Sequence, residues 1–433
     1  MPASPAPLLS PLPNGLRLVG IAMPHRHTLA LSVFIRTGSL HESRRDNGIS
    51  HVVEHMAFKG TPTRNCQQIN LAAEQLGADL NAYTDRDHTA YQIEGLADDL
   101  PTFVELLADI VLNGTFPEEE LARERQVILH ELTEVQEDPA AMAFQAFDRA
   151  AYGASHPAGR PIIGQRANIE RFSRDELCTY VRRQYTACNT VVAVAGPLTA
   201  TRWRALERQV AACFGAMPTG QPNTVAPALW AGGVRQHRLA GSSQTQVVIG
   251  FSAPTLADET RGGSVAADVL AATLLGEGMS SPLLDDIRER RGLAYYVACS
   301  ADVQPLTGQF VIEAATGAKE ASEYLGAVAQ LLTRLAQDGP QDVDWARARK
   351  QLAVRALRHL EQPGRRLETA AQDLFTFGRL RDPHEVLARL QAVSPAEVQA
   401  VFQRLVASPA AVALAGHVPT RLREQAHTLW ATA

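Results

Sequence analysis

Short stretches of alternating apolar and polar residues predict β-strands along the chain. Residues 29–35 place Leu, Leu, Val and Ile at every second position, which is the period of a half-buried strand. A second strand is predicted over 16–22, directly after the turn signal Asn14-Gly15, and a third over 190–195. Stretches with helical periodicity follow these strands, so the pattern predicts an α+β protein.

The pattern repeats in the second half of the chain. Three segments recur in the same order and at nearly the same spacing: Val192–Gly196 as Val412–Gly416, the capping box of Ser173 and Glu176 as Ser394 and Glu397, and Leu121–Arg125 as Trp345–Arg349. Chance could explain one such pair of segments. Three pairs at nearly one spacing favour a duplicated domain that fills about half of the chain.

The repeat predicts the domain organisation. With 433 residues, the chain is too long for a single hydrophobic core. Residues 218–233 are rich in proline and glycine and form the best linker candidate. We therefore predict an N-terminal domain over 1–217 and a C-terminal domain over 234–433. Both are expected to be homologous α+β domains in which a mixed sheet packs with helices.

Composition narrows the class of protein. Apolar residues make up 45% and charged residues 20% of a chain with a net charge of -5, which gives no sign of a nucleic-acid or membrane partner. No apolar run is long enough to span a bilayer, and residues 1–7 lack the basic and apolar parts of a leader peptide. The five scattered cysteines argue against a disulfide framework. We expect a cytoplasmic protein.

Two histidines one helical turn apart are the first candidates for chemistry. His51 and His55 lie between the turn signals Gly48 and Gly60, and at this i, i+4 spacing their imidazoles can converge on one metal ion. Glu54 precedes the second histidine, where a carboxylate can take a proton from a metal-activated water. The alternative is two solvated histidines beside a surface ion pair. The short motif alone leaves both interpretations open.

Two carboxylates in the helix predicted after Pro117 favour the metal site. Positions 121, 124, 128, 131 and 135 have the spacing of a buried stripe, and Glu124 and Glu131 occupy two of them. Buried carboxylates need a cation, a charged partner or a raised pKa. The alternative is a tilted helix that keeps both glutamates in solvent, as we expect for Glu134 and Glu137.

Two histidines and one glutamate form the ligand set of a catalytic rather than a structural zinc ion, because the fourth position stays open for water. We therefore predict one Zn²⁺ per chain, held by His51, His55 and one of the two glutamates of the stripe, with Glu54 as the general base. Imidazole and carboxylate ligands do not exclude manganese or cobalt. The repeat indicates that only the first half holds a metal, since Ala348 and Arg355 stand at the positions that correspond to the two glutamates of the stripe.

A longer pattern surrounds these residues and extends over the chain. It comprises Pro13–Arg17, Gly38–Ser39, Gly48–Thr61, Asn81–Thr84, Glu124–Glu131 and Gly292–Tyr295. In these segments the chain resembles the pitrilysin/insulinase family of inverted-motif zinc metallopeptidases, and most closely its short-subunit, mitochondrial-processing-peptidase-like branch. The resemblance implies a zinc endopeptidase that cuts short or unfolded peptides, including leader or presequence segments.

The resemblance also implies roles for individual residues. It assigns the zinc ligands to His51, His55 and Glu131 and the general base to Glu54. It gives Glu124 the role of an acid that supports activity. It places Asn81 and Ala82 on an edge strand along which the substrate lies as an added β-strand. Arg288 and Tyr295 correspond to a pair that contacts the substrate, where the tyrosine hydroxyl can donate to the developing oxyanion.

One loop departs from the sequence pattern of the family. Relatives commonly carry arginine after a Ser-Ser pair, where this chain has Pro282, so the resemblance does not predict the geometry of that loop. The family's short subunits usually close into a clamshell, which implies a homodimer or a heterodimer with a homologous subunit.

Two functions from other classes compete with the peptidase. The first is a non-catalytic scaffold subunit, and the intact ligand set and base argue against it. The second is a peptide-binding or maturation module that works only beside a separate partner. A neighbouring gene for a similar chain without the inverted motif would favour the second alternative.

Overall fold

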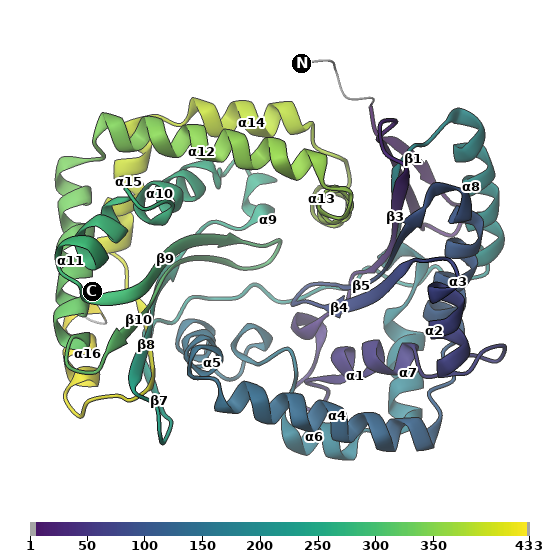
Figure 1. Ribbon diagram of the computed structural model, residues 1–433, viewed down its shortest axis with the longest axis horizontal. Helices are drawn as coiled ribbons and strands as arrows, with labels where there is room; N and C mark the ends of the chain where they lie inside the picture. Colours follow the sequence, from purple (N-terminus) through teal and green to yellow (C-terminus); the bar gives the residue numbers. More distant parts are fainter. Residues whose placement is uncertain (1–5, 431–433) are drawn as a thin grey trace. The chain divides into compact units, whose positions relative to one another are not determined.

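The computed structural model describes residues 6–430 (Figure 1). Residues 1–7, considered above for a leader peptide, lie largely outside the described residues. The chain forms two compact units, and each takes segments from both halves of the sequence. The first unit comprises the described residues up to Leu132, Pro161–Val225 and His359–Arg381; the second comprises Thr133–Arg160, Ala226–Arg358 and the described residues from Asp382.

The first unit is built on a six-stranded mixed sheet in the order β1-β2-β6-β3-β5-β4. β2 and β6 run parallel, and all other neighbours run antiparallel. The strands predicted over 16–22, 29–35 and 190–195 are β2, β3 and β6. The bounds are β1 (Leu8–Pro11), β2 (Arg17–Ala22), β3 (Thr28–Ile35), β4 (Asp79–Thr84), β5 (Thr89–Leu96) and β6 (Thr190–Gly196).

Helices cover both faces of this sheet, so the prediction of a half-buried strand over 29–35 is wrong. Leu31 and Val33 of β3 belong to the core on one face, beneath α1, α3 and α8, while Phe34 belongs to the core beneath α13 on the other. Successive side chains of a strand point to opposite faces. The helices are α1 (Ile49–Ala57), α2 (Cys66–Glu74), α3 (Leu100–Asn113), α4 (Glu118–Glu137, in this unit up to Leu132), α6 (Arg166–Arg171), α7 (Arg174–Gln184), α8 (Ala200–Phe214) and α13 (Pro363–Phe377).

The second unit is built on a five-stranded sheet in the order β7-β11-β8-β10-β9. β11 pairs parallel with β7 and antiparallel with β8, as β6 does with β2 and β3. Five strands thus have the same order in both sheets, which confirms the predicted pair of similar α+β domains. The bounds are β7 (Gly233–Arg238), β8 (Gln244–Ser252), β9 (Ala294–Val303), β10 (Gly308–Gly317) and β11 (Ala411–Gly416).

The second sheet is also covered on both faces. α5 packs on one face with Phe147 over Gly250, where a Cβ atom would lie 2.5 Å from the phenyl ring. α10, α11 and α15 form the core on the other face. The helices are α5 (Pro139–Tyr152), α9 (Leu256–Glu259), α10 (Ala266–Gly276), α11 (Ala321–Asp338), α12 (Asp342–Glu361, in this unit up to Arg358), α14 (Pro383–Ala392), α15 (Pro395–Val406) and α16 (Leu422–Trp430).

One helix of each half of the sequence packs on the sheet formed mainly by the other half (Figure 1). α5 belongs to the first half of the chain but covers the second sheet, and α13 belongs to the second half but covers the first. Neither half of the sequence therefore supplies the helices on both faces of its own sheet. The domain boundaries 1–217 and 234–433 stay a prediction. No helix among residues 6–430 has the length and apolarity needed to cross a membrane.

Candidate metal centre

Helix α1 carries His51, Glu54 and His55 and is anchored at its start. Gly48 precedes the helix with a φ of 99°, and a Cβ atom there would lie 2.8 Å from Cα of Gly164. Only glycine adopts this conformation readily in so little space. The buried carboxylate of Glu42 accepts hydrogen bonds from the backbone N–H groups of Gly48 and Ser50, at 2.8 and 2.9 Å. These contacts satisfy free donors at the helix N-terminus and fix the direction of α1.

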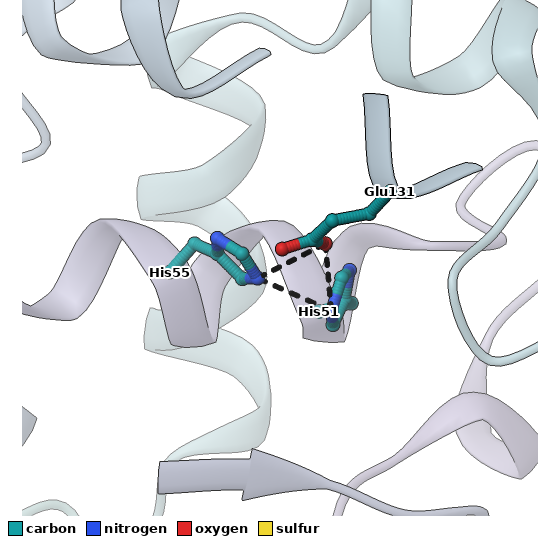
Figure 2. Close-up of side chains that lie close together, drawn as sticks. All are labelled: His51, His55 and Glu131. Carbon is teal, nitrogen blue, oxygen red and sulfur yellow. Dashed lines mark hydrogen bonds and ion pairs between the residues drawn. The ribbon is translucent and has the colours of Figure 1, made fainter. Parts of the chain in front are cut away.

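The two histidines and Glu131 direct one potential ligand atom each to a common point (Figure 2). Nε2 of His51 and Nε2 of His55 lie 3.2 Å apart. Oε2 of Glu131, on α4, lies 3.9 and 3.6 Å from these two nitrogens. Ligands of a tetrahedral zinc ion, with bonds of roughly 2.0–2.1 Å, lie about 3.3 Å from one another. The three side chains therefore fit a single cation of this size.

Glu124 occupies the other predicted position of the α4 stripe and contacts His55 rather than the metal position. Its Oε1 lies 2.9 Å from Nδ1 of His55, and its Oε2 lies 2.7 Å from Nζ of Lys59. Only 7% of Glu124 is exposed, which excludes the tilted, solvated helix for this residue. A carboxylate on Nδ1 holds the tautomer that leaves Nε2 free for a metal.

The two imidazoles differ in their affinity for protons. Burial, with the neighbouring His55, lowers the pKa of His51 to about 3. Burial also lowers the pKa of His55, but the hydrogen bond to Glu124 and the charges of the three nearby glutamates outweigh it and raise that pKa above the ordinary value. Of the two imidazoles, His55 therefore binds a second proton more readily, and a metal has to displace that proton from Nε2.

Glu54 points to Thr84, a residue that the sequence did not single out for a role. Oγ1 of Thr84 donates a hydrogen bond of 2.9 Å to Oε2 of Glu54. Burial raises the pKa of the Glu54 carboxyl, while the charge of His55 and this hydrogen bond oppose the rise. The strand period could have indicated the contact, because Ala82 and Thr84 lie on the same face of β4 and Ala82 packs in the core that includes α1.

The predicted substrate-binding residues lie in both units. Asn81 and Ala82 are on β4, which is an edge strand of the first sheet, as predicted. Arg288 and Tyr295 are neighbours in the second unit, where the guanidinium lies 5.4 Å from the centre of the tyrosine ring and 81% of Tyr295 is exposed. A contact of any of these four residues with substrate stays a prediction.

Pro282 does not disturb the loop in which it departs from the resemblance. It is the first residue of a helical segment that continues as a π-helix over Leu284–Arg290. Ser281 precedes it, and its carbonyl accepts from the N–H of Asp285 at 2.9 Å. Proline is well tolerated at the first helical position, because the N–H that it lacks has no partner in the helix.

A second group of potential ligands, Asp85, Asp87 and His88, follows β4. Nδ1 of His88 lies 2.8 Å from Oδ1 of Asp87, and its Nε2 lies 3.2 Å from the hydroxyl of Tyr83. Both ring nitrogens are therefore already engaged. In this structure the group forms a hydrogen-bonded Tyr-His-Asp chain.

The corresponding positions of the second unit cannot hold a metal. Ala348 is fully buried where the first unit has Glu124. Arg355 stands in place of Glu131, and its guanidinium pairs with the carboxylate of Glu277 at 2.6 Å. α10, the counterpart of α1, contains no histidine.

Comparison with known proteins confirms the resemblance. The sequence profile described as Insulinase (Peptidase family M16) matches residues 17–166, and that described as Peptidase M16 inactive domain matches residues 171–352. An uncharacterised zinc protease of Mycobacterium bovis is 33% identical over 424 residues, which cover 96% of this chain and 95% of the relative. An uncharacterised zinc protease of Rickettsia bellii is 29% identical over 410 residues, or 94% and 97% of the two chains. A crystal structure of a peptidase M16 inactive domain from Pseudomonas fluorescens shares the fold, with a TM-score of 0.85 at 20% identity over 95% of this chain and 98% of that one. The chain thus belongs to the insulinase family, peptidase family M16.

Proposed function

We propose that this chain is a zinc-dependent endopeptidase that hydrolyses short or unfolded peptides. The observation that carries the proposal is the convergence of two imidazole nitrogens and a carboxylate oxygen within 3.9 Å of one another, with Glu54 on the same helix as the two histidines. The names of the relatives, zinc proteases, support the same metal and the same reaction.

The chemistry divides between the metal and the residues around it. Zinc held by His51, His55 and Glu131 would lower the pKa of a bound water to about 7 and polarise the scissile carbonyl. Glu54 takes the proton of the attacking water and delivers it to the leaving amine. Glu124 keeps His55 in the ligating tautomer, and Thr84 holds the Glu54 carboxylate in place.

The substrate would bind as an extended strand along the free edge of β4. Backbone hydrogen bonds to an edge strand recognise a peptide without regard to most of its side chains. Asn81 and Ala82 would contact its backbone, and we propose Arg288 and Tyr295 as further residues that contact substrate. A leader or presequence fits this mode of binding. The proposal includes a cytoplasmic dimer, formed with a second copy or with a homologous subunit.

Removal and return of the metal test the proposal. The purified chain should contain about one zinc ion and cut a mixed set of quenched peptides. A chelator should stop cleavage, and added zinc should restore it. Zinc binding without any cleavage would instead favour a subunit that needs a separate partner. A chain that binds no zinc would contradict the proposal.

Thr84→Val should lower kcat by about 10- to 100-fold, because the lost hydrogen bond to a carboxylate is worth about 1.5–3 kcal/mol. Valine has the shape of threonine without its hydroxyl, so KM, zinc content and thermal stability should change little. Thr84→Ser keeps the hydroxyl and should retain most of the activity. Equal losses in the valine and serine variants would show that the hydroxyl does not position Glu54.

Zinc affinity should fall as the pH falls, because His55 has to lose a proton when zinc binds. Since the pKa of His55 lies above the ordinary value, the fall begins at higher pH than for a free imidazole and approaches about tenfold per pH unit. Glu124→Gln removes the charged partner of Nδ1 and should move the fall to lower pH. Competition with a chelator of known affinity between about pH 5.5 and 8 measures both curves. Coincident curves would contradict the role given to Glu124.

A further inference from the structure

A second concave site lies in the second unit, beside β7, an edge strand of its sheet. The pocket has a volume of about 540 Å³, in the range of pockets that bind small molecules. Its walls come from the end of α4, from α5 and from β7. The side chains that line it are Gln136, Met142, Gln145, Ala146, Arg149, Ala154, Arg235, Gln236 and His237.

The side chains that line this pocket carry positive charge and no negative charge. Arg149 and Arg235 contribute two guanidinium groups, and the lining contains no carboxylate, although the whole chain has a net charge of -5. Both arginines are exposed, and neither side chain forms an ion pair or hydrogen bond with another residue of the described range 6–430. Their positive charge is therefore not neutralised by the protein.

A pocket of similar size in the first unit provides the contrast. It has a volume of about 590 Å³ and is lined by two arginines as well. There, Arg26 pairs with Glu94 at 3.4 Å, and Arg365 pairs with Glu368 at 3.2 Å. The arginines of the first pocket are thus paired with carboxylates and those of the pocket beside β7 are not, so of these two pockets the one beside β7 is better suited to an anion.

We propose that the pocket beside β7 binds a small polyvalent anion that carries phosphate or carboxylate groups. The planar guanidinium of arginine matches either group with two parallel hydrogen bonds. The amides of Gln136, Gln145 and Gln236 and the half-buried imidazole of His237 supply further donors around the two charges. The site does not include the candidate zinc ligands and does not depend on the proposed peptidase function.

Calorimetric titration of the full chain at low salt tests the site, with inorganic triphosphate and citrate as probes. At least one probe should bind with one equivalent per chain, and the affinity should fall with added salt. The triphosphate arm and the citrate arm show which anionic group the pocket prefers. The double variant Arg149→Ala/Arg235→Ala should lose at least about tenfold in affinity, and both side chains are exposed, so the fold should be kept.

Arg238→Ala is the matched control, since Arg238 is an exposed arginine of the same strand that does not line the pocket. This variant should bind like the wild type. Absence of binding by the wild type to both probes would overturn the proposal. Equal affinities of the wild type and the double variant would also overturn it, because binding would then arise from general surface charge.

Discussion

Glu54→Gln is expected to lower kcat for peptide cleavage by about 10²- to 10⁴-fold, the usual contribution of a general base, while zinc remains bound. The carboxamide has the shape of the carboxylate, and its oxygen can still accept the hydrogen bond of Thr84. It cannot take a proton from water. Because Glu54 is not one of the three converging ligand side chains, the zinc content should equal that of the wild type.

Initial rates on a quenched peptide and metal analysis of the same samples measure this effect. Glu74→Gln, an exposed glutamate at the end of α2, is a suitable control and should behave like the wild type. Full activity of Glu54→Gln would remove Glu54 from the mechanism. Loss of zinc together with activity would mean that Glu54 helps to hold the metal instead.

Glu131→Gln is expected to weaken zinc binding by more than about a hundredfold, beyond the roughly 10- to 100-fold cost of removing a partner of a metal ligand. The change removes the only anionic ligand of the proposed set and leaves two neutral imidazoles, so cleavage should disappear at ordinary zinc concentrations. Saturating zinc should restore part of the activity.

Glu134→Gln is the matched control for this change, because Glu134 is exposed and lies one turn further along the same helix. Zinc affinity from chelator competition and cleavage rates should be unchanged in this variant. A Glu131→Gln chain with the affinity of the wild type would exclude Glu131 as a ligand.

Much of the metal centre could be predicted because the spacing of its residues within single helices determines which helix face they occupy. The spacing of His51 and His55 fixes their shared helix face, and the stripe of α4 places Glu124 and Glu131 on one face of that helix, where Glu124 is buried and Glu131 is half-exposed. Periodicity alone could not tell which glutamate faces the metal, since both occupy stripe positions, and the family resemblance selected Glu131. The structure separates them through Nδ1 of His55 and the ammonium of Lys59, contacts that depend on how α4 packs against α1.

The parts that sequence reasoning missed arise from long-range packing. Thr84 meets Glu54 only because β4 lies against α1. The period of β4 puts Thr84 on the same face as Ala82, but it does not show that α1 packs on that face. The burial of β3 on both faces depends on α13, a helix that lies in the other half of the sequence. The echo of Val192–Gly196 in Val412–Gly416, in contrast, predicted the repeated sheet because the two strands hold the same position in it.

Location of the metal tests the central claim most directly. Crystals of the zinc-loaded chain, measured on both sides of the zinc absorption edge, should show one anomalous peak at about 2.0–2.2 Å from Nε2 of His51, Nε2 of His55 and a carboxylate oxygen of Glu131. A peak at Asp87 and His88 instead, or no peak between the two histidines of α1, would contradict the account.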